Sequence, residues 1–82
     1  MIGLYPNPNA GMFTVEMRGL PQAEVACRLS DTLGQLVKTE TLNFGTGSLN
    51  HRFAYPDLPS AVYMLEIRSG LRAHLEKVLI DR

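Results

Sequence analysis

The sequence predicts an all-β fold, an immunoglobulin-like antiparallel β-sandwich of about seven strands, and three observations support it. Short runs of alternating apolar and polar residues recur along the chain, and alternation is the pattern of a strand with one buried face. Turn-forming residues separate these runs about every 8–12 residues, the spacing of a sandwich. No long stretch places its apolar residues at helical spacing.

The first half of the chain contains four of the expected strands. The first ends before the run Pro6-Asn7-Pro8, because each proline removes a backbone donor and fixes φ. A turn from Asp31 to Gly34 separates the third strand from the fourth. The strands are expected near residues 2–5, 12–18, 23–30 and 35–42. The core-facing residues of the second and third are Phe13, Val15, Met17, Val25, Cys27 and Leu29.

The second half contains three more strands, expected near residues 47–54, 61–68 and 71–80. A proline-containing break at 55–60 separates the first from the second. Ser69-Gly70 then joins the last two strands at the spacing of a β-hairpin. The apolar residues expected to face the core in the first two are Leu49, Phe53, Tyr63, Leu65 and Ile67.

The last strand does not alternate in a single phase. Leu71, Ala73 and Leu75 share one phase, whereas Val78 and Ile80 share the other. A β-bulge near residues 76–77 would reconcile the two sets, because one inserted residue reverses the facing of all that follow. The alternative is a strand that is apolar on both faces, with one face covered by something outside the domain.

Composition and charge exclude several classes of protein. The 82 residues and 9.1 kDa suit one small domain spanning 1–82. Eight basic and eight acidic residues give a net charge of zero, so no basic nucleic-acid-binding face is expected. The single cysteine excludes a disulfide within the chain and a zinc site built on paired cysteines. No apolar run approaches the length of a membrane span, and the first residues do not resemble a signal peptide.

The residues that could support catalysis are too scattered to suggest an enzyme. His51 and His74 are the only histidines, and no serine lies in a GxSxG motif. His51 is expected at a sheet edge or half-buried, as a hydrogen-bonding group. Cys27 is expected in the core. Outward-facing Glu16, Glu24 and Glu66 stand near Arg18, Arg28 and Arg68, which suggests cross-strand ion pairs rather than a catalytic pair of carboxylates.

No cofactor or metal is expected. The run 7–11 faintly resembles part of a calcium loop, but it lacks acidic ligands, so a proline-fixed turn with Asx hydrogen bonds is the better interpretation. The run 45–48 is glycine-rich, but neither a lysine nor a helix follows it, so it is interpreted as a flexible turn. An alternative function is an adhesive or carbohydrate-binding module of a secreted hydrolase, which would present aromatic side chains. The candidates for such a platform are Tyr5, Phe44 and Tyr55.

The order of several motifs is more specific than any one of them. The domain opens with Tyr5-Pro6-Asn7-Pro8, followed by Gly11 and Phe13, and continues through Asp31-x-x-Gly34. Leu58-Pro59 leads to Val62-Tyr63, and the chain closes with Lys77-Val78-Leu79-Ile80-x-Arg82. From Leu4 to Arg82, the chain resembles the C-terminal sorting domain of the type IX (Por) secretion system, in its type A form.

The resemblance implies a non-catalytic targeting domain of Bacteroidetes-type bacteria, cut from the end of a larger secreted protein. The expected partners are an N-terminal passenger domain, the outer-membrane secretion translocon and a sortase-like surface protease. The expected route leads through the periplasm to the cell surface or the medium. The family usually has glycine where this chain has Ala61, so a positive φ there would be strained and the turn is expected to differ.

The resemblance also implies two groups of functional residues. The first is a set for translocon recognition in the last hairpin: Tyr63, Leu65, Ile67, Gly70, Lys77, Val78, Ile80 and Arg82. The second is a structural motif: Tyr5, Pro6, Asn7, Pro8, Gly11, Phe13, Asp31 and Gly34.

Overall fold

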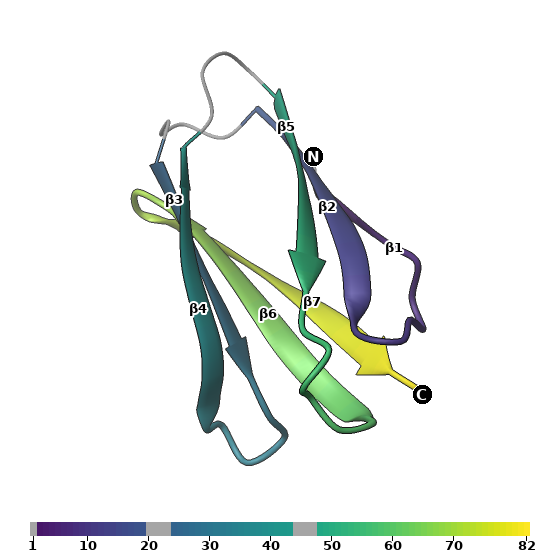
Figure 1. Ribbon diagram of the computed structural model, residues 1–82. Coiled ribbons are helices and arrows are strands. Elements are labelled where there is room, and N and C mark those ends of the chain that lie inside the picture. Colours follow the sequence, from purple (N-terminus) through teal and green to yellow (C-terminus); the bar gives the residue numbers. More distant parts are fainter. Residues whose placement is uncertain (1, 20–23, 44–47) are drawn as a thin grey trace.

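The computed structural model describes residues 2–19, 24–43 and 48–82, which form seven strands (Figure 1). Each strand begins and ends within one residue of its predicted range. No helix in the described ranges is long and apolar enough to cross a membrane. The strands are β1 (Ile2–Tyr5), β2 (Met12–Arg18), β3 (Glu24–Ser30), β4 (Leu36–Asn43), β5 (Ser48–Ala54), β6 (Ala61–Ser69) and β7 (Arg72–Ile80).

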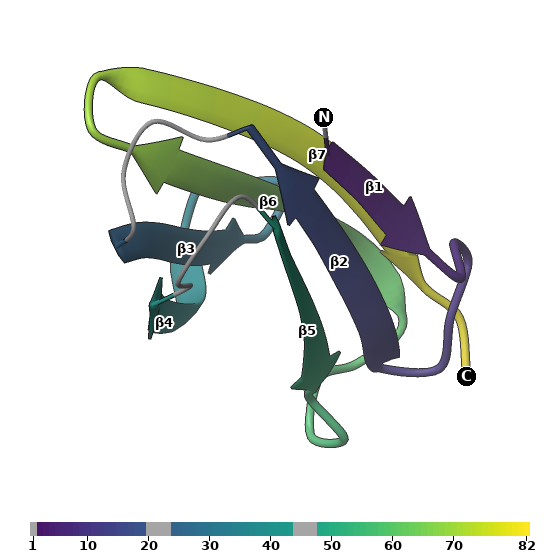
Figure 2. The same ribbon diagram turned by 90° about the horizontal axis from the view of Figure 1, so that it is seen from above.

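The strands form two packed sheets, which confirms the predicted β-sandwich. One sheet has the order β1-β2-β5 and the other β4-β3-β6-β7, and every pairing within them is antiparallel. The pairs β2–β5 and β3–β6 join strands that are not consecutive in the chain, as in an immunoglobulin-like arrangement. Seen from above, β1 and β7 lie at the same side of the sandwich, one in each sheet (Figure 2).

The core lies between the sheets and contains most of the residues that alternation assigned to it, although Leu49 is only partly buried. It also contains Leu42, Tyr55 and Leu58, which alternation did not assign. Phe13 and Phe53 are opposite one another in the β2–β5 register, and their rings stack with centroids 5.1 Å apart. Cys27 is buried among them, as predicted. The most deeply buried side chains are Phe13, Phe53, Met17, Leu29, Leu65, Ile67, Ile80, Val15, Val25, Val78 and Cys27.

The predicted bulge near residues 76–77 is wrong. Pairing between β6 and β7 runs without interruption from Ala61–Ile80 to Ser69–Arg72. The register of this sheet shifts instead between β3 and β4, where Leu29 pairs with Lys38 and Ser30 with Leu36, so that Val37 of β4 is left over. The inward phase of β7 includes His74 and Glu76, whose side chains remain partly exposed. Near the β6–β7 turn, the inward-facing positions of β7 are therefore partly open to solvent, so polar residues can occupy them.

β7 has apolar residues on both faces without a bulge, as in the alternative interpretation, but its inward face also carries His74 and Glu76. Val78 and Ile80 face the core, whereas Leu75 and Leu79 point to the opposite side and are exposed. Leu71, in the hairpin turn, is fully exposed. Ala61 is the first residue of β6, and no described residue other than glycine has a positive φ. Ala61 therefore does not have the positive φ that would strain it.

Candidate functional site

The last hairpin, β6–β7, contains all but one of the residues predicted for translocon recognition, and most of those side chains are in the core. Gly70 is exposed in the two-residue turn, with a φ of 61°, and Lys77 is exposed on the outer face of β7. The five buried members cannot be contacted by a partner while the domain stays folded. These are Tyr63, Leu65, Ile67, Val78 and Ile80.

Tyr63 shows why one polar residue belongs in this core. Its ring is buried, and its hydroxyl donates to the carbonyl of Pro59 at 2.8 Å. A buried tyrosine needs such an acceptor, because an unpaired hydroxyl loses its hydrogen bonds to water on folding. The hydrogen bond also attaches the Leu58-Pro59 segment of the break to β6, which gives that sequence motif a structural role.

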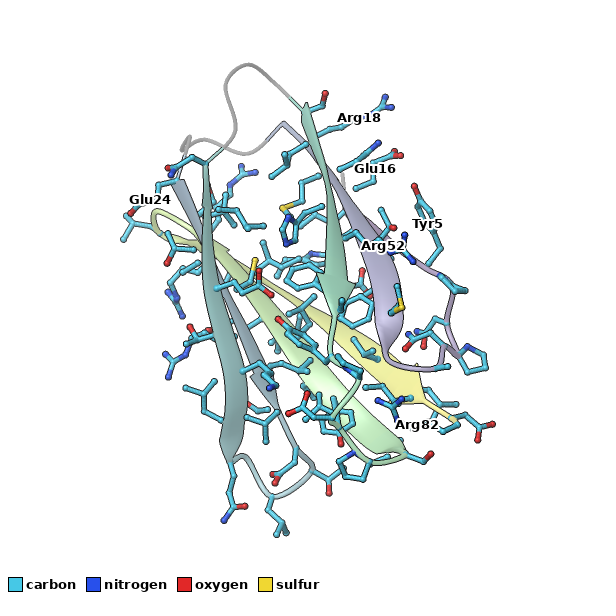
Figure 3. All side chains as sticks on the ribbon, in the orientation of Figure 1. Tyr5, Glu16, Arg18, Glu24, Arg52 and Arg82 are labelled. Atoms are coloured by element: carbon cyan, nitrogen blue, oxygen red, sulfur yellow. The ribbon has the colours of Figure 1, made fainter. Side chains whose placement is uncertain are left out.

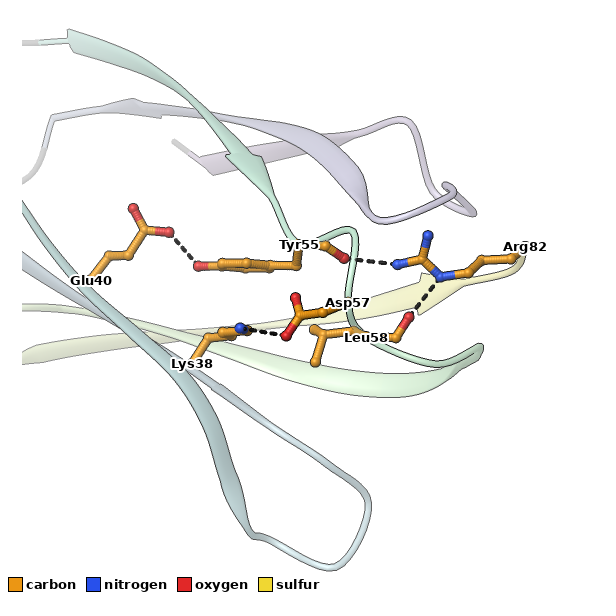
Figure 4. A network of polar contacts seen from close by, with 6 residues as sticks. All are labelled: Lys38, Glu40, Tyr55, Asp57, Leu58 and Arg82. Carbon is orange, nitrogen blue, oxygen red and sulfur yellow. Dashed lines mark hydrogen bonds and ion pairs between the residues drawn. The ribbon is translucent and has the colours of Figure 1, made fainter.

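Arg82 acts as a clamp on the loops at the C-terminal end of β7. Its Nε donates to the carbonyl of Leu58 at 2.6 Å, and its Nη2 donates to the carbonyl of Tyr55 at 2.8 Å (Figure 4). Its Nη1 reaches the carbonyl of Ala10 at 2.9 Å, and its backbone N–H donates to Ser60 Oγ. The fixed geometry of guanidinium suits several carbonyls at once, so Arg82 ties the end of the chain to two other segments.

The proline-rich motif is fastened to β7 through two asparagines, which we call the asparagine latch (Asn7 and Asn9). Asn7 donates from Nδ2 to the carbonyl of Lys77 at 2.8 Å and accepts at Oδ1 from the N–H of Leu79 at 2.9 Å. The backbone of Asn9 donates to the carbonyl of Leu79 and accepts from the N–H of Asp81. The latch therefore occupies the free edge of β7 from Lys77 to Asp81.

The Asx turn predicted in this motif is confirmed. Asn9 is almost fully buried, and its Oδ1 accepts from the N–H of Gly11 at 2.9 Å while its Nδ2 donates to the carbonyl of Pro6. The Tyr5-Pro6 and Asn7-Pro8 peptide bonds are both cis. The sequence indicated the turn but did not indicate that both asparagines would also bond to β7, because their partners lie about 70 residues away in sequence.

Gly11, Phe13 and Tyr5 complete the structural motif in three different ways. Gly11 has a φ of 103°, and a Cβ added there would lie 2.8 Å from the carbonyl oxygen of Tyr55 and 2.6 Å from Nη2 of Arg82. Only glycine fits so close to the Arg82 clamp. Phe13 is in the core, whereas Tyr5 is 49% exposed and points away from the sandwich (Figure 3).

The Asp31–Gly34 turn forms as predicted. Asp31 Oδ1 accepts from the N–H groups of Leu33 and Gln35, both at 2.9 Å, and the Asp31 carbonyl accepts from Gly34 N–H. Gly34 has a φ of 82°, which residues with a Cβ rarely adopt. The motif is therefore local: its contacts shape the connection between β3 and β4 and do not extend to the last hairpin.

A polar network between β4 and β5 was not foreseen from the sequence. Glu40 accepts a hydrogen bond from the Tyr55 hydroxyl (Figure 4). Glu40 also contacts His51 Nε2 at 3.1 Å. Lys38 bonds Asp57 at 2.9 Å and lies 5.5 Å from the centre of the Tyr55 ring. Lys38 and Glu40 occupy inward positions of β4, opposite Leu29 and Cys27. The network therefore links the two sheets along their β4–β5 side.

Burial and this network shift three pKa values. Burial, together with the hydrogen bond to Glu40, raises the pKa of Tyr55 well above its ordinary value. Burial, with a smaller contribution from the charge of Glu40, raises the pKa of Cys27 to about 12. The hydrogen bond from Lys38 holds the pKa of Asp57 below its ordinary value. Tyr55 is 8% exposed, so the expectation that it belongs to an exposed aromatic platform is wrong.

The remaining candidates for catalysis and sugar binding do not gather into a site. His51 is half-buried beside Glu40, as expected, whereas His74 contacts Glu76 at 2.9 Å in the other sheet. Phe44 and residues 45–47 lie outside the described residues, so Tyr5 is the one platform candidate that the structure shows exposed. Within the described ranges, no cluster of histidine, cysteine, aspartate and glutamate side chains could hold a metal.

The expectation of cross-strand ion pairs is wrong in its geometry. Glu16 pairs with Arg18 at 3.5 Å and Glu66 with Arg68 at 3.3 Å, in each case two residues along the same strand. Residues two apart share one face of a strand, so a long side chain can reach its neighbour without crossing to the next strand. These exposed pairs contribute little stability and keep the outer faces polar.

A cleft of about 340 Å³ opens between the two sheets near the β6–β7 turn. Its lining residues from β6 and β7 include Ile67, Ser69 and His74, and the facing residues of the other sheet include Ile2 and Arg18. Arg18 and His74 have acidic neighbours in Glu16 and Glu76.

Comparison with known proteins relates nearly the whole chain to one family. Residues 3–81 match the family model described as the secretion system C-terminal sorting domain. A search of curated proteins finds no significant match. The matched region contains both sheets, the asparagine latch and all of the last hairpin. The chain therefore belongs to the family of secretion system C-terminal sorting domains, which are non-catalytic signals for the Por (type IX) secretion system.

Proposed function

We propose that this chain is a sorting domain of type A, spanning 1–82, whose last hairpin is read by the outer-membrane secretion translocon. The family match over residues 3–81 carries the proposal. The Tyr5-Pro6-Asn7-Pro8 motif, the Asp31-x-x-Gly34 turn and the motif Lys77-Val78-Leu79-Ile80-x-Arg82 support the assignment to type A. Engagement with secretion machinery and secretion to the cell surface follow from membership of the family.

The remaining steps are part of the same proposal. A passenger domain joined ahead of Ile2 travels through the periplasm, and a sortase-like surface protease removes the sorting domain after export. The passenger then stays at the cell surface or is released. Figure 1 shows the N- and C-termini at different ends of the sandwich, so a passenger ahead of Ile2 leaves the C-terminal end of β7 accessible.

In the folded domain, the translocon would read the exposed members of the recognition set. Lys77 stands on the outer face of β7, and Gly70 shapes the turn that presents the hairpin. The five buried members would act indirectly, by holding β6 and β7 in place against the core. Arg82 would likewise act through the clamp that it forms on the carbonyls of Tyr55, Leu58 and Ala10.

The experiment that tests the proposal fuses residues 1–82 behind a periplasmic reporter. Reporter at the cell surface is measured in cells with the secretion machinery and in cells without it. Surface export that depends on the machinery supports the proposal, and equal export in both strains contradicts it. Removing residues 77–82 should abolish export, but this deletion also removes Val78 and Ile80 from the core.

A point variant separates recognition from folding. Lys77→Ala changes an exposed side chain on the outer face of β7, so the melting temperature should stay unchanged while export falls. Arg28→Ala is the matched control, because Arg28 is an exposed cation of the same sheet outside the hairpin. Full export of Lys77→Ala would show that Lys77 takes no part in recognition.

A further inference from the structure

The outer face of the three-stranded sheet places Tyr5 in one row with a polar residue of each neighbouring strand. In the register of β1, β2 and β5, Tyr5 pairs with Thr14 and Thr14 pairs with Arg52. These three side chains point away from the core, because their neighbours along β2 and β5, such as Phe13 and Phe53, fill it. Figure 3 shows Tyr5 and Arg52 on the side of the sandwich away from β3 and β4.

A second row lies beside the first on the same face. Glu16 pairs with Gly3 of β1 on one side and with Asn50 of β5 on the other. A Cβ added at Gly3 would have no atom within 4 Å, so the surface next to the Tyr5 ring is open. We call the two rows together the Tyr5 face, which consists of Gly3, Tyr5, Thr14, Glu16, Asn50 and Arg52.

Tyr5 supplies an apolar ring at one border of this face. Its side chain is 49% exposed, and within the described ranges its hydroxyl has no hydrogen-bond partner. An exposed aromatic ring beside a residue without a side chain offers a flat surface on which an apolar group can stack. The predicted platform joined Tyr5 to Phe44 and Tyr55, whereas the structure surrounds Tyr5 with hydrogen-bonding residues of β2 and β5.

Arg52 supplies a cation at the opposite border. Its guanidinium contacts the sulfur of Met12 at 3.8 Å and meets no carboxylate in the part of the chain that the structure describes. Arg18 and Arg68, by contrast, each pair with a glutamate of their own strand. A guanidinium without an acidic partner is complementary to a carboxylate, which it can bind through two hydrogen bonds.

The middle of the face requires a ligand that also donates hydrogen bonds. Glu16 makes only a long contact with Arg18, at 3.5 Å, so its carboxylate can accept further hydrogen bonds. Thr14 can donate and accept, and Asn50 is exposed beside Glu16. A ligand with negative charge and no donor would be repelled by Glu16. The occupant must therefore combine one carboxylate, several hydroxyl donors and an apolar surface.

We propose that the Tyr5 face binds an acidic polysaccharide through one of its uronic acid residues. A uronic acid carries the three features on a single sugar ring: an apolar C–H surface, a carboxylate and hydroxyl groups. The ring stacks on Tyr5 above Gly3, and its carboxylate bonds to Arg52. Its hydroxyls bond to Thr14 and Glu16. The backbones at Tyr5 and Arg52 are two strand spacings apart, roughly 10 Å, and the long Arg52 side chain shortens that span.

This activity goes beyond the proposed sorting function and uses the other sheet. The Tyr5 face belongs to β1, β2 and β5, whereas Lys77 stands on the outer face of the four-stranded sheet. The two outer faces of a sandwich point in opposite directions, so a partner on one leaves the other accessible. Loss of sugar binding therefore says nothing about export, and the two proposals are tested separately.

Isothermal titration calorimetry of the 82-residue chain with oligogalacturonate, a chain of galacturonic acid, tests the site. The wild type should bind. Tyr5→Ala and Arg52→Ala should each weaken binding at least about tenfold, because each removes one of the two bordering contacts. Tyr5→Phe keeps the ring and should bind as the wild type does. Circular dichroism establishes that every variant is folded.

Arg28→Ala is the matched control, because it removes an exposed cation of the other sheet and should leave binding unchanged. A neutral galactose oligosaccharide should bind at least about tenfold more weakly than oligogalacturonate, since it lacks the carboxylate. No binding of oligogalacturonate at about 10 mM overturns the proposal. So does an Arg28→Ala chain weakened as much as Arg52→Ala, or poly-L-glutamate bound as tightly as the acidic sugar.

Discussion

Asn7 donates a hydrogen bond to Lys77 across a separation of 70 residues, from the first loop of the chain to its last strand. The same side chain accepts from Leu79 N–H, so one amide substitutes for a neighbouring strand on the edge of β7. The sandwich is thereby closed on its β1–β7 side by a side chain and a short piece of backbone, with no regular strand pairing between the two sheets.

Asn7→Ala should destabilise the domain by about 1–2 kcal/mol, because it removes two hydrogen bonds whose β7 partners then rely on water. Urea unfolding measures the loss. Asn7→Asp should also be less stable than the wild type, because a carboxylate still accepts from Leu79 N–H but cannot donate to the Lys77 carbonyl. Asn50→Ala, on the exposed side of β5, is the control and should change the free energy of unfolding by less than about 0.5 kcal/mol. Equal losses in the Asn7→Ala and Asn50→Ala variants would contradict the role of the latch.

Gly11→Ala should destabilise the domain by about 2 kcal/mol or more, because the added Cβ would meet the Tyr55 carbonyl at 2.8 Å and requires an unfavourable φ. Gly3→Ala is a suitable control, since a Cβ there would have no atom within 4 Å. Thermal unfolding of both variants gives the comparison. A Gly11→Ala chain as stable as Gly3→Ala would show that the approach of Arg82 and Tyr55 is not tight.

Arg82→Lys should lower the free energy of unfolding by about 1–3 kcal/mol although it keeps the charge, because an ammonium cannot reproduce the bonds to the Leu58, Ala10 and Tyr55 carbonyls. Arg72→Lys, at an exposed position in β7, should be neutral. Chemical denaturation distinguishes the two variants. If Arg82→Lys unfolds as the wild type does, the contribution of Arg82 is its charge and not its geometry.

Alkaline pH should destabilise the domain through Cys27. Its thiol has a pKa raised from 9.0 to about 12, so below pH 9 the folded and unfolded chains both keep the proton. Above pH 9 the unfolded chain releases its proton first, and stability should fall by up to about 1.4 kcal/mol per pH unit. Tyr55, whose pKa is also raised by burial, adds to the fall above pH 10.

Urea unfolding of the wild type and of Cys27→Ala, from about pH 8 upward, measures this effect. The variant is less stable at neutral pH because it leaves a small cavity, but its stability should stay flat between pH 9 and pH 10. Parallel pH profiles for the two chains would mean that the thiol does not titrate differently on folding.

Alternation predicted the strands well because a half-buried strand leaves a period-two pattern wherever one face meets the core. Alternation failed in β7 at His74 and Glu76. Their side chains face inward but remain partly exposed to solvent, so apolar residues are not required at these positions. Local chemistry likewise predicted the Asp31 turn and the Asx turn at Asn9, since their donors lie within a few residues.

The contacts that define the candidate site could not be predicted in the same way. Three of these hydrogen bonds join residues that are distant in sequence and that only the topology brings together. They are Asn7 with Leu79, Arg82 with Ala10, and Glu40 with Tyr55. Tyr55 in particular follows β5 within a proline-containing break, which suggested exposure, whereas the network with Glu40 and Lys38 buries it. A single sequence contains no local signal for such distant pairs.

The bonds between Asn9 and residues 79 and 81 join the beginning of the domain to its end. The opening loop therefore acquires its β7 partners only when residues 79–81 are in place. A cut anywhere in that last stretch would release the beginning of the domain as well as its end.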